Sequence, residues 1–252
     1  MDENKNTNND TGTLESPSKL LSKLDNFWYH YKWHTIVGLF LIFVVTICSF
    51  QMCTKEKYDV HILYSGSYEI ERTSKDGNFP EYGAFISSFK KVTDDYDKDG
   101  NVSLSLKDLF MLSDKEIEEI PKADSSVEIN RPLLIENKSI LSETLIYSDY
   151  YVCLLSPSVY NEYNTIDGIE MFSPLSQYVH NNADIEYYSD SAIYLSSTEF
   201  YSLPGICNLP DDTLICLRNI SAIANHFNEK QAAEARRRSI HVVENIINYH
   251  AN

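Results

Sequence analysis

The chain contains one long apolar stretch, TIVGLFLIFVVTICSFQMC, which covers residues 35–53 without a charged side chain. As a helix, these nineteen residues extend about 28 Å, close to the thickness of the hydrocarbon layer of a bilayer. A cleaved signal peptide has a shorter apolar region after a short basic start. This stretch instead follows a long polar segment, so the pattern predicts an uncleaved transmembrane helix that anchors the chain in a membrane.

The residues before this stretch fall into two parts. Residues 1–17 contain one aliphatic residue, Leu14, and no aromatic one, which predicts a disordered tail. Residues 18–34 place leucines at the spacing of one helix face and then gather aromatic side chains in FWYHYKWH. Aromatic rings with polar edges settle at the boundary between membrane and water. We therefore expect an amphipathic, aromatic juxtamembrane helix at 18–34.

The lysines beside the apolar stretch give an expected orientation. Three lysines lie before it, within residues 18–34, and two lie after it, at Lys55 and Lys57. Positive charge next to a span is enriched on the cytoplasmic side. The balance of three to two predicts a cytoplasmic tail at the N-terminus. Residues 54–252 are then expected outside the cell membrane.

Residues 54–252 alternate between strand-like and helix-like patterns. Apolar runs and period-two alternation mark strands, whereas three- and four-residue apolar steps mark helices. The strand patterns cover residues 58–64, 102–106, 150–155, 192–195 and 213–217. The helical patterns cover residues 82–92, 114–120, 130–147, 159–163 and 226–249. Such alternation is typical of an α/β layer fold, so we predict a single α/β domain with a mixed sheet and helices on both faces.

An acidic segment, DDYDKDGNVSLSL, lies between a predicted helix and a predicted strand. Within it, Asp95, Asp97, Asp99, Gly100 and Asn101 match the start of a calcium-binding loop, D-x-D-x-D-G. Carboxylates at alternate positions converge on one point when the backbone coils, and glycine permits the sharp turn. The three aspartates and the asparagine are therefore predicted metal ligands, with calcium as the cation.

The same segment also fits a turn that binds no cation. The twelfth position of the loop is Leu106, where an EF-hand carries a bidentate glutamate. In addition, Val102, Leu104 and Leu106 alternate with polar residues, which predicts a strand and not the exiting helix of an EF-hand. An Asx-rich turn from helix to strand is the alternative. Both interpretations stay open at this point.

Polar residues follow four of the predicted strands. In open α/β sheets, ligands bind beyond the carboxyl ends of the strands, so these residues are predicted ligand-binding positions. They are Ser65, Ser67, Ser156, Ser158, Ser196, Ser197, Thr198 and Arg218. Serine and threonine at such places also cap the helix that follows, which is the alternative interpretation.

Composition narrows the classes of partner. With 37 acidic against 21 basic residues, the formal net charge is −16, which argues against nucleic acid as a partner. The motifs G-x-S-x-G and H-E-x-x-H do not occur, and we expect no enzyme. Cys207 and Cys216 flank a Pro-Asp turn, and this spacing fits either a disulfide or two separately buried thiols.

Several segments together resemble a group of single-pass bacterial membrane proteins that have no assigned activity. The resemblance rests on FWYHYKWH, the apolar stretch, the D-x-D-x-D-G turn, SDYYVCLLSPSVY and LSSTEFYSLPGICNLPDDTLICLR. The outer domain of that group is similar to a periplasmic binding protein. The resemblance covers about residues 27–220, and it implies a fold and a location more than a function.

These observations lead to two expectations of function from different classes. The first is a membrane-anchored extracytoplasmic domain that binds a small ligand or acts as a sensor, without catalysis. The second is a structural or interaction subunit of a cell-envelope complex, whose partner is another envelope protein. The second expectation is compatible with the acidity of the chain, its 18 tyrosines and the aromatic juxtamembrane segment.

Overall fold

The computed structural model of the chain describes most of its residues. The described residues are 17–53, 58–70, 80–123, 128–166, 168–180, 184–220 and 222–250, with only the backbone described for 17–26, 50–53 and 222–228. The chain divides into two units, Met1–Glu56 and Lys57–Asn252, and each is described by itself. The predicted disordered tail lies outside the described residues except for Pro17, where the first helix begins.

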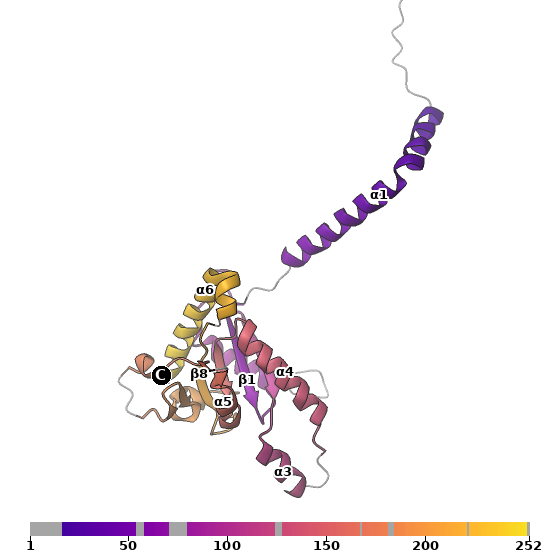
Figure 1. The fold of residues 1–252 in the computed structure, drawn as a ribbon. Helices are drawn as coiled ribbons and strands as arrows, with labels where there is room; N and C mark the ends of the chain where they lie inside the picture. The colour runs from indigo at the N-terminus through magenta and orange to yellow at the C-terminus, as the bar shows by residue number, and fades with distance from the viewer. Residues whose placement is uncertain are drawn as a thin grey trace, which may run out of the picture. The chain divides into compact units, whose positions relative to one another are not determined.

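The described residues of the first unit form one helix, α1 (Pro17–Cys53; Figure 1). The predicted juxtamembrane and transmembrane helices are therefore parts of one continuous helix. Within α1, Phe27–Ser49 is long and apolar enough to span a membrane. It shares residues 35–49 with the predicted span at residues 35–53. Its large apolar side chains are exposed, and an exposed apolar surface of this length suits a lipid environment.

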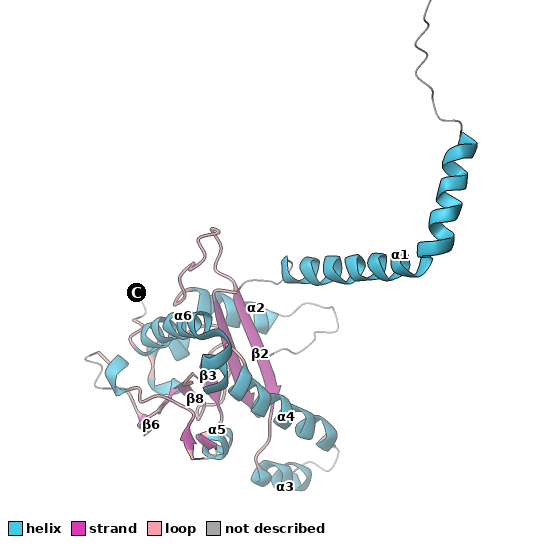
Figure 2. Ribbon diagram, turned by 45° about the horizontal axis from the view of Figure 1, so that its top comes forward, coloured by secondary structure: helices cyan, strands magenta, loops and turns pink. Residues whose placement is uncertain are grey.

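The second unit is built on a six-stranded mixed sheet (Figure 2). Its strands are β1 (Val60–Gly66), β2 (Leu104–Phe110), β3 (Val152–Leu155), β6 (Tyr187–Ser189), β7 (Ala192–Tyr194) and β8 (Leu214–Leu217). Their order across the sheet is β2-β1-β3-β8-β7-β6. β1 is parallel to β2 and to β3, whereas β8 is antiparallel to both β3 and β7. β1, β2, β3 and β7 therefore run in one direction, and β8 runs in the other.

Helices cover both faces of this sheet. The helices of the second unit are α2 (Pro80–Lys90), α3 (Asp114–Ala123), α4 (Arg131–Tyr147), α5 (Pro157–Tyr163) and α6 (Ala222–Ile247). One apolar cluster joins α2 and α6 to one face, and a second joins α4 and α5 to the other. Along β3 the side chains alternate, so that Leu154 belongs to the first cluster and Cys153 to the second. The predicted α/β domain with a mixed sheet and helices on both faces is confirmed.

Two of the helices begin where local sequence signals place them. The Asn130 side chain accepts a hydrogen bond from the backbone N–H of Leu133 at 3.1 Å and caps α4, whose first turn contains a proline. Ser156 caps α5 in the same way, again with a proline at the first helical position. Between these two helices, all four residues of β3 are buried. Caps and a continuous apolar run are local features, which is why the sequence predicts this part of the chain well.

The segment 164–190 is built from short elements. It contains the two-stranded hairpin β4 (Thr165–Ile166) and β5 (Ile169–Glu170), the 3₁₀ turn η1 (Ser176–Tyr178) and the edge strand β6. These strands have two or three residues each and are partly exposed. An alternating apolar pattern has no length in which to develop there, so the sequence does not reveal them.

The cysteines of the domain are free thiols. Cys207 is exposed and Cys216 is buried, and neither forms a disulfide. The disulfide alternative for these two residues is therefore wrong, and the buried-thiol alternative holds for Cys216 only. Burial raises the pKa of the Cys153 thiol to about 12 and raises that of Cys216 as well, so both buried thiols stay protonated.

Candidate functional site

The acidic segment forms a tight loop between α2 and β2. The two carboxylate oxygens of Asp95 accept hydrogen bonds from the backbone N–H groups of Asp99 and Gly100, at 3.2 and 2.8 Å. The backbone N–H of Asn101 donates to the Asp99 carboxylate at 2.7 Å. Lys98 and Gly100 have φ angles of 61° and 92°, the left-handed conformation that such a sharp turn requires. The loop is thus coiled as the D-x-D-x-D-G pattern predicts.

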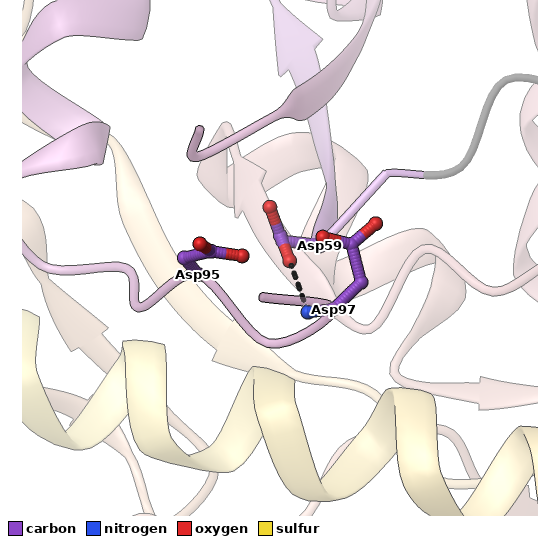
Figure 3. A group of neighbouring side chains, drawn as sticks. All are labelled: Asp59, Asp95 and Asp97. Carbon is purple, nitrogen blue, oxygen red and sulfur yellow. Dashed lines mark hydrogen bonds between the residues drawn. The ribbon is translucent and has the colours of Figure 1, made fainter. Parts of the chain in front are cut away.

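A carboxylate from a distant segment meets this loop. Asp59 lies immediately before β1, is buried, and accepts hydrogen bonds from the backbone N–H groups of Tyr96 and Ser103, both at 2.8 Å. Figure 3 shows its side chain beside those of Asp95 and Asp97, with a hydrogen bond of 3.3 Å from the Asp97 N–H. Each of the three aspartates offers a carboxylate oxygen, and these oxygens lie within 4.8 Å of one another.

The predicted metal ligands are thus only partly brought together. Of the three predicted aspartates, Asp95 and Asp97 belong to the cluster, whereas Asp99 does not. Asp59 completes the cluster in place of Asp99, and no sequence pattern selects it. Its position follows from sheet register, since Val60 pairs with Leu104 and the residue before β1 therefore reaches the end of the loop.

The cluster has the chemistry of a hard-cation site. Burial disfavours the charged form of Asp95, but donation from the backbone N–H groups of Gly100, Lys98 and Asp99 outweighs burial and lowers the pKa of this carboxyl group. A group of carboxylates, without nitrogen or sulfur donors, suits calcium or magnesium better than zinc. The residues present therefore fit the predicted cation.

The predicted ligand-binding serines and threonine lie at one edge of the sheet. Ser65 is the penultimate residue of β1, and the others follow β1, β3 and β7. These three strands run in the same direction, so their carboxyl ends share that edge. The backbone N–H of Ser156 donates to the Ser65 carbonyl at 2.9 Å, which fixes the first two segments side by side. The register Leu155–Leu214–Tyr194 brings the end of β7 level with that of β3.

Most of these hydroxyl groups are already engaged locally. Ser156 caps α5 and contacts the Ser158 hydroxyl at 3.0 Å. After β7, the hydroxyl groups of Ser197 and Thr198 donate to backbone carbonyls of the preceding turn, both at 2.7 Å, and Ser196 donates to the Asp211 carbonyl at 2.6 Å. The Ser65 hydroxyl group is buried and has no hydrogen-bond partner among the described residues, and Ser67 is half-buried. Capping and turn formation thus account for the hydroxyl contacts at 156 and at 196–198.

A cavity opens at the same edge, on the face covered by α4 and α5. Its volume is about 650 Å³, and it lies among the segment after β2, the first turns of α3 and α4, and α5. Apolar side chains line it, among them Leu112, Ile135 and Val159, together with the predicted ligand-binding residue Ser158. Lys138 and Glu162 also line it and form an ion pair at 2.5 Å, which raises the pKa of the lysine.

Arg218 does not belong to this edge. It follows β8, which runs in the opposite direction, so it lies at the amino end of β3. Its guanidinium group is completely buried and donates to the carbonyls of Leu145, Ser148 and Tyr150, with the Leu145 bond at 2.7 Å and the Tyr150 bond at 2.9 Å. It also stacks on the Tyr151 ring, 4.4 Å from the ring centroid. Arg218 therefore connects the C-terminal turn of α4 with the segment before β3, and its buried guanidinium group donates to backbone carbonyls of the protein itself.

No protein-family model matches the chain, and neither the comparison with curated proteins nor that with solved structures finds a similar protein. The resemblance to proteins with a periplasmic-binding-protein-like domain therefore stays a prediction.

Proposed function

We propose that the protein is a membrane-anchored, non-catalytic domain that binds a small ligand beyond the carboxyl ends of its sheet strands. The cavity of about 650 Å³ at that edge is the observation that carries this proposal. Its volume lies within the range of small-molecule sites, and ligand sites of open α/β sheets lie at this edge. The strand order supports the same place, because the chain moves from β1 to β2 and then back across β1 to β3.

The lining of the cavity points to an amphipathic ligand. Leu112, Ile135 and Val159 offer an apolar wall, and Lys138 with Glu162 places both signs of charge beside it. A zwitterion with an apolar side chain, such as a free amino acid or a short peptide, combines the two features. Sugars and dicarboxylates match the apolar wall less well.

The test uses a matched pair of variants on α4. Ile135 lines the cavity and is 71 % exposed, whereas Tyr147, at the other end of the helix, is 59 % exposed and does not line it. Thermal shifts of the detergent-solubilised chain are measured with a panel of amino acids, short peptides and sugars. A ligand should stabilise the wild type and the Tyr147→Arg variant but not the Ile135→Arg variant. If no ligand shifts the wild-type midpoint, small-molecule binding at this site is refuted.

Anchoring and orientation belong to the same proposal. Phe27–Ser49 supplies the membrane segment, and the lysine balance supports a cytoplasmic N-terminus with residues 54–252 outside. Protease added to intact cells should then degrade the domain, while the same protease after lysis serves as the positive control. Protection of the domain in intact cells would reverse the orientation.

A second function, as an interaction subunit of an envelope complex, is supported by α3. None of its ten residues is buried, although it contains two isoleucines, and Figure 1 shows it at the lower end of the domain. A helix with little core contact is suited to a partner protein. Cross-linking in the native membrane should capture that partner, and recovery of the monomer alone would contradict this function.

Calcium binding is a further part of the proposal. Asp95 and Asp97 supply two carboxylates from the loop, and Asp59 supplies the acidic ligand that Leu106 does not. Few ligands and an exposed loop favour an affinity of about 0.1–1 mM, as in extracellular calcium modules. Calorimetry of the full chain with CaCl₂ tests it, with MgCl₂ as the competing hard cation. No heat at millimolar calcium would refute the site.

A further inference from the structure

Two buried cysteines lie opposite each other on the two central strands of the sheet. Cys153 of β3 and Cys216 of β8 are register partners in the antiparallel pair that these strands form. Both belong to the apolar cluster that joins α4 and α5 to the sheet, so their side chains project from the same face. Both residues are 0 % exposed, and both are free thiols. The pair lies outside the ligand cavity and the aspartate cluster.

The register places the two backbones at a separation that a disulfide can bridge. Directly opposed residues of an antiparallel pair have Cα atoms about 4.5–5.5 Å apart. Disulfides join residues whose Cα atoms lie about 4.4–6.8 Å apart and whose side chains do not point away from each other. Cys153 and Cys216 fit both conditions, because they are opposed in register and project from one face. A bond between them needs no change of strand register.

Loss of the Cys153 thiol hydrogen leaves no carbonyl without a donor. Sγ of Cys153 lies 3.8 Å from the carbonyl oxygen of Tyr150 and 3.9 Å from that of Tyr151, and a thiol is a weak donor. Each of these carbonyls also accepts a hydrogen bond of 2.9 Å from Arg218. The Tyr150 carbonyl accepts it from Nε, and the Tyr151 carbonyl accepts it from the backbone N–H. Oxidation of Cys153 therefore leaves both acceptors paired.

The pair is protected from reagents while the sheet is intact. Burial raises the pKa of the Cys153 thiol to about 12. Burial, and after it the neighbouring Cys153, raise the pKa of the Cys216 thiol. The thiolate is the form that attacks a disulfide, so both thiols react slowly in the folded domain. In the unfolded chain, solvent reaches both sulfur atoms, and folding is therefore the stage at which a bond between them can form.

We propose that Cys153 and Cys216 form a cross-strand disulfide when the domain folds in the presence of a low-molecular-weight disulfide. One cysteine thiolate attacks a sulfur of the reagent, which breaks the S–S bond of the reagent, releases one reagent thiol and leaves a mixed disulfide on the protein. The second cysteine thiolate attacks the protein sulfur of that mixed disulfide and releases the other reagent thiol. The two cysteines are oxidised, the reagent is reduced, and the two protons that the cysteines lose are taken up by the released thiols.

The bond joins the two halves of the sheet, with β2, β1 and β3 on one side of it and β8, β7 and β6 on the other. It closes a loop of about 60 residues, which restricts the unfolded chain. The thermal midpoint of the linked chain should therefore exceed that of the reduced chain by at least about 5 °C. Such bonds persist in oxidising spaces, where the proposed orientation places the domain. The reaction itself depends neither on that orientation nor on ligand binding.

The experiment refolds the reduced, detergent-solubilised full chain from guanidinium chloride, with oxidised glutathione as the probe. N-ethylmaleimide then blocks the remaining thiols, and mass spectrometry of proteolytic fragments identifies linked cysteines. The wild type should yield fragments joined through Cys153 and Cys216. The matched control Cys207→Ala removes an exposed thiol and should yield the same link, whereas Cys216→Ala should lose it. The folded reduced chain, exposed to the same probe for the same time, should keep both cysteines as thiols.

Four results would overturn the proposal. The first is a refolded wild type in which both buried cysteines are alkylated. The second is a link from Cys153 or Cys216 to Cys207 in place of the cross-strand link. The third is oxidation of the folded chain as fast as that of the refolding chain. The fourth is a linked chain no more stable to heat than the reduced chain, because the sheet would then have to distort to form the bond. Thermal midpoints of the reduced variants show that each one is folded.

Discussion

Replacement of Arg218 should destabilise the domain more than replacement of any surface arginine. The guanidinium group is 0 % exposed, donates to three backbone carbonyls and stacks on the Tyr151 ring. In Arg218→Met, the carbonyls of Leu145, Ser148 and Tyr150 lose their charged donor in a site with little water. Each unsatisfied buried acceptor costs about 1–3 kcal/mol, and the last turn of α4 loses a favourable cation as well.

These terms overlap, because one α4 turn carries two of the carbonyls and partial relaxation admits water. We therefore expect a loss of about 3–5 kcal/mol in the free energy of unfolding, as for other disrupted buried charges. That is a large fraction of the roughly 5–15 kcal/mol that stabilises a typical domain. For a domain of this size it lowers the thermal midpoint by about 6–20 °C. The unfolding free energy of Arg218→Lys should lie between those of the wild type and Arg218→Met, since an ammonium group cannot reproduce the planar set of donors.

The assay is urea denaturation of the detergent-solubilised chain followed by circular dichroism. Tryptophan fluorescence does not report on the domain, because Trp28 and Trp33 both lie in α1. The matched control is Arg237→Met, which removes an exposed arginine of α6 that pairs with Glu234 at 2.9 Å. An exposed pair contributes about 0–1 kcal/mol. Equal unfolding free energies for the Arg218→Met and Arg237→Met variants would refute the assignment of Arg218 to the fold.

Three further predictions concern calcium binding at the aspartate cluster, ligand binding in the cavity that Ile135 lines, and the dependence of stability on pH. Asp59→Asn should weaken calcium binding at least tenfold, whereas Asp99→Asn should weaken it less than threefold. If calorimetry shows the reverse, the calcium ligands come from the loop alone, without the distant Asp59 carboxylate. Ile135→Arg should abolish the thermal shift produced by a ligand of the wild type, and Tyr147→Arg should preserve it; a shift that survives in both variants would place the ligand elsewhere. Hydrogen bonds from two arginines lower the pKa of Glu234 from 4.5 to about 2. Its ion pairs therefore contribute stability above about pH 4.5 that is lost as the pH falls through about 2. Glu234→Gln should flatten the dependence of the thermal midpoint on pH in this range, and an unchanged dependence would contradict this prediction.

Local patterns were sufficient for the elements that extend over many residues. The helix α4 matches its predicted range within a residue, because its cap, its proline and its apolar spacing all lie within the same short segment. The strand β3 is a continuous apolar run and is buried at every residue, as the run predicts. The anchor helix is also a local property, since charge-free length alone identifies it.

The candidate sites depended on strand direction and register, which no local pattern contains. Polar residues follow both β3 and β8, yet Ser156 and Arg218 lie at opposite edges of the sheet because β8 is antiparallel to β3. Likewise, the D-x-D-x-D-G loop is visible in the sequence, but Asp59 joins it only because β1 pairs with β2 in one particular register. The sequence by itself thus determined an α/β domain preceded by a helix long and apolar enough to span a membrane, the coiled acidic loop and the helix caps. Only the tertiary structure decided which side chains meet, because contacts between residues far apart in the chain arise from packing of the whole sheet and its helices.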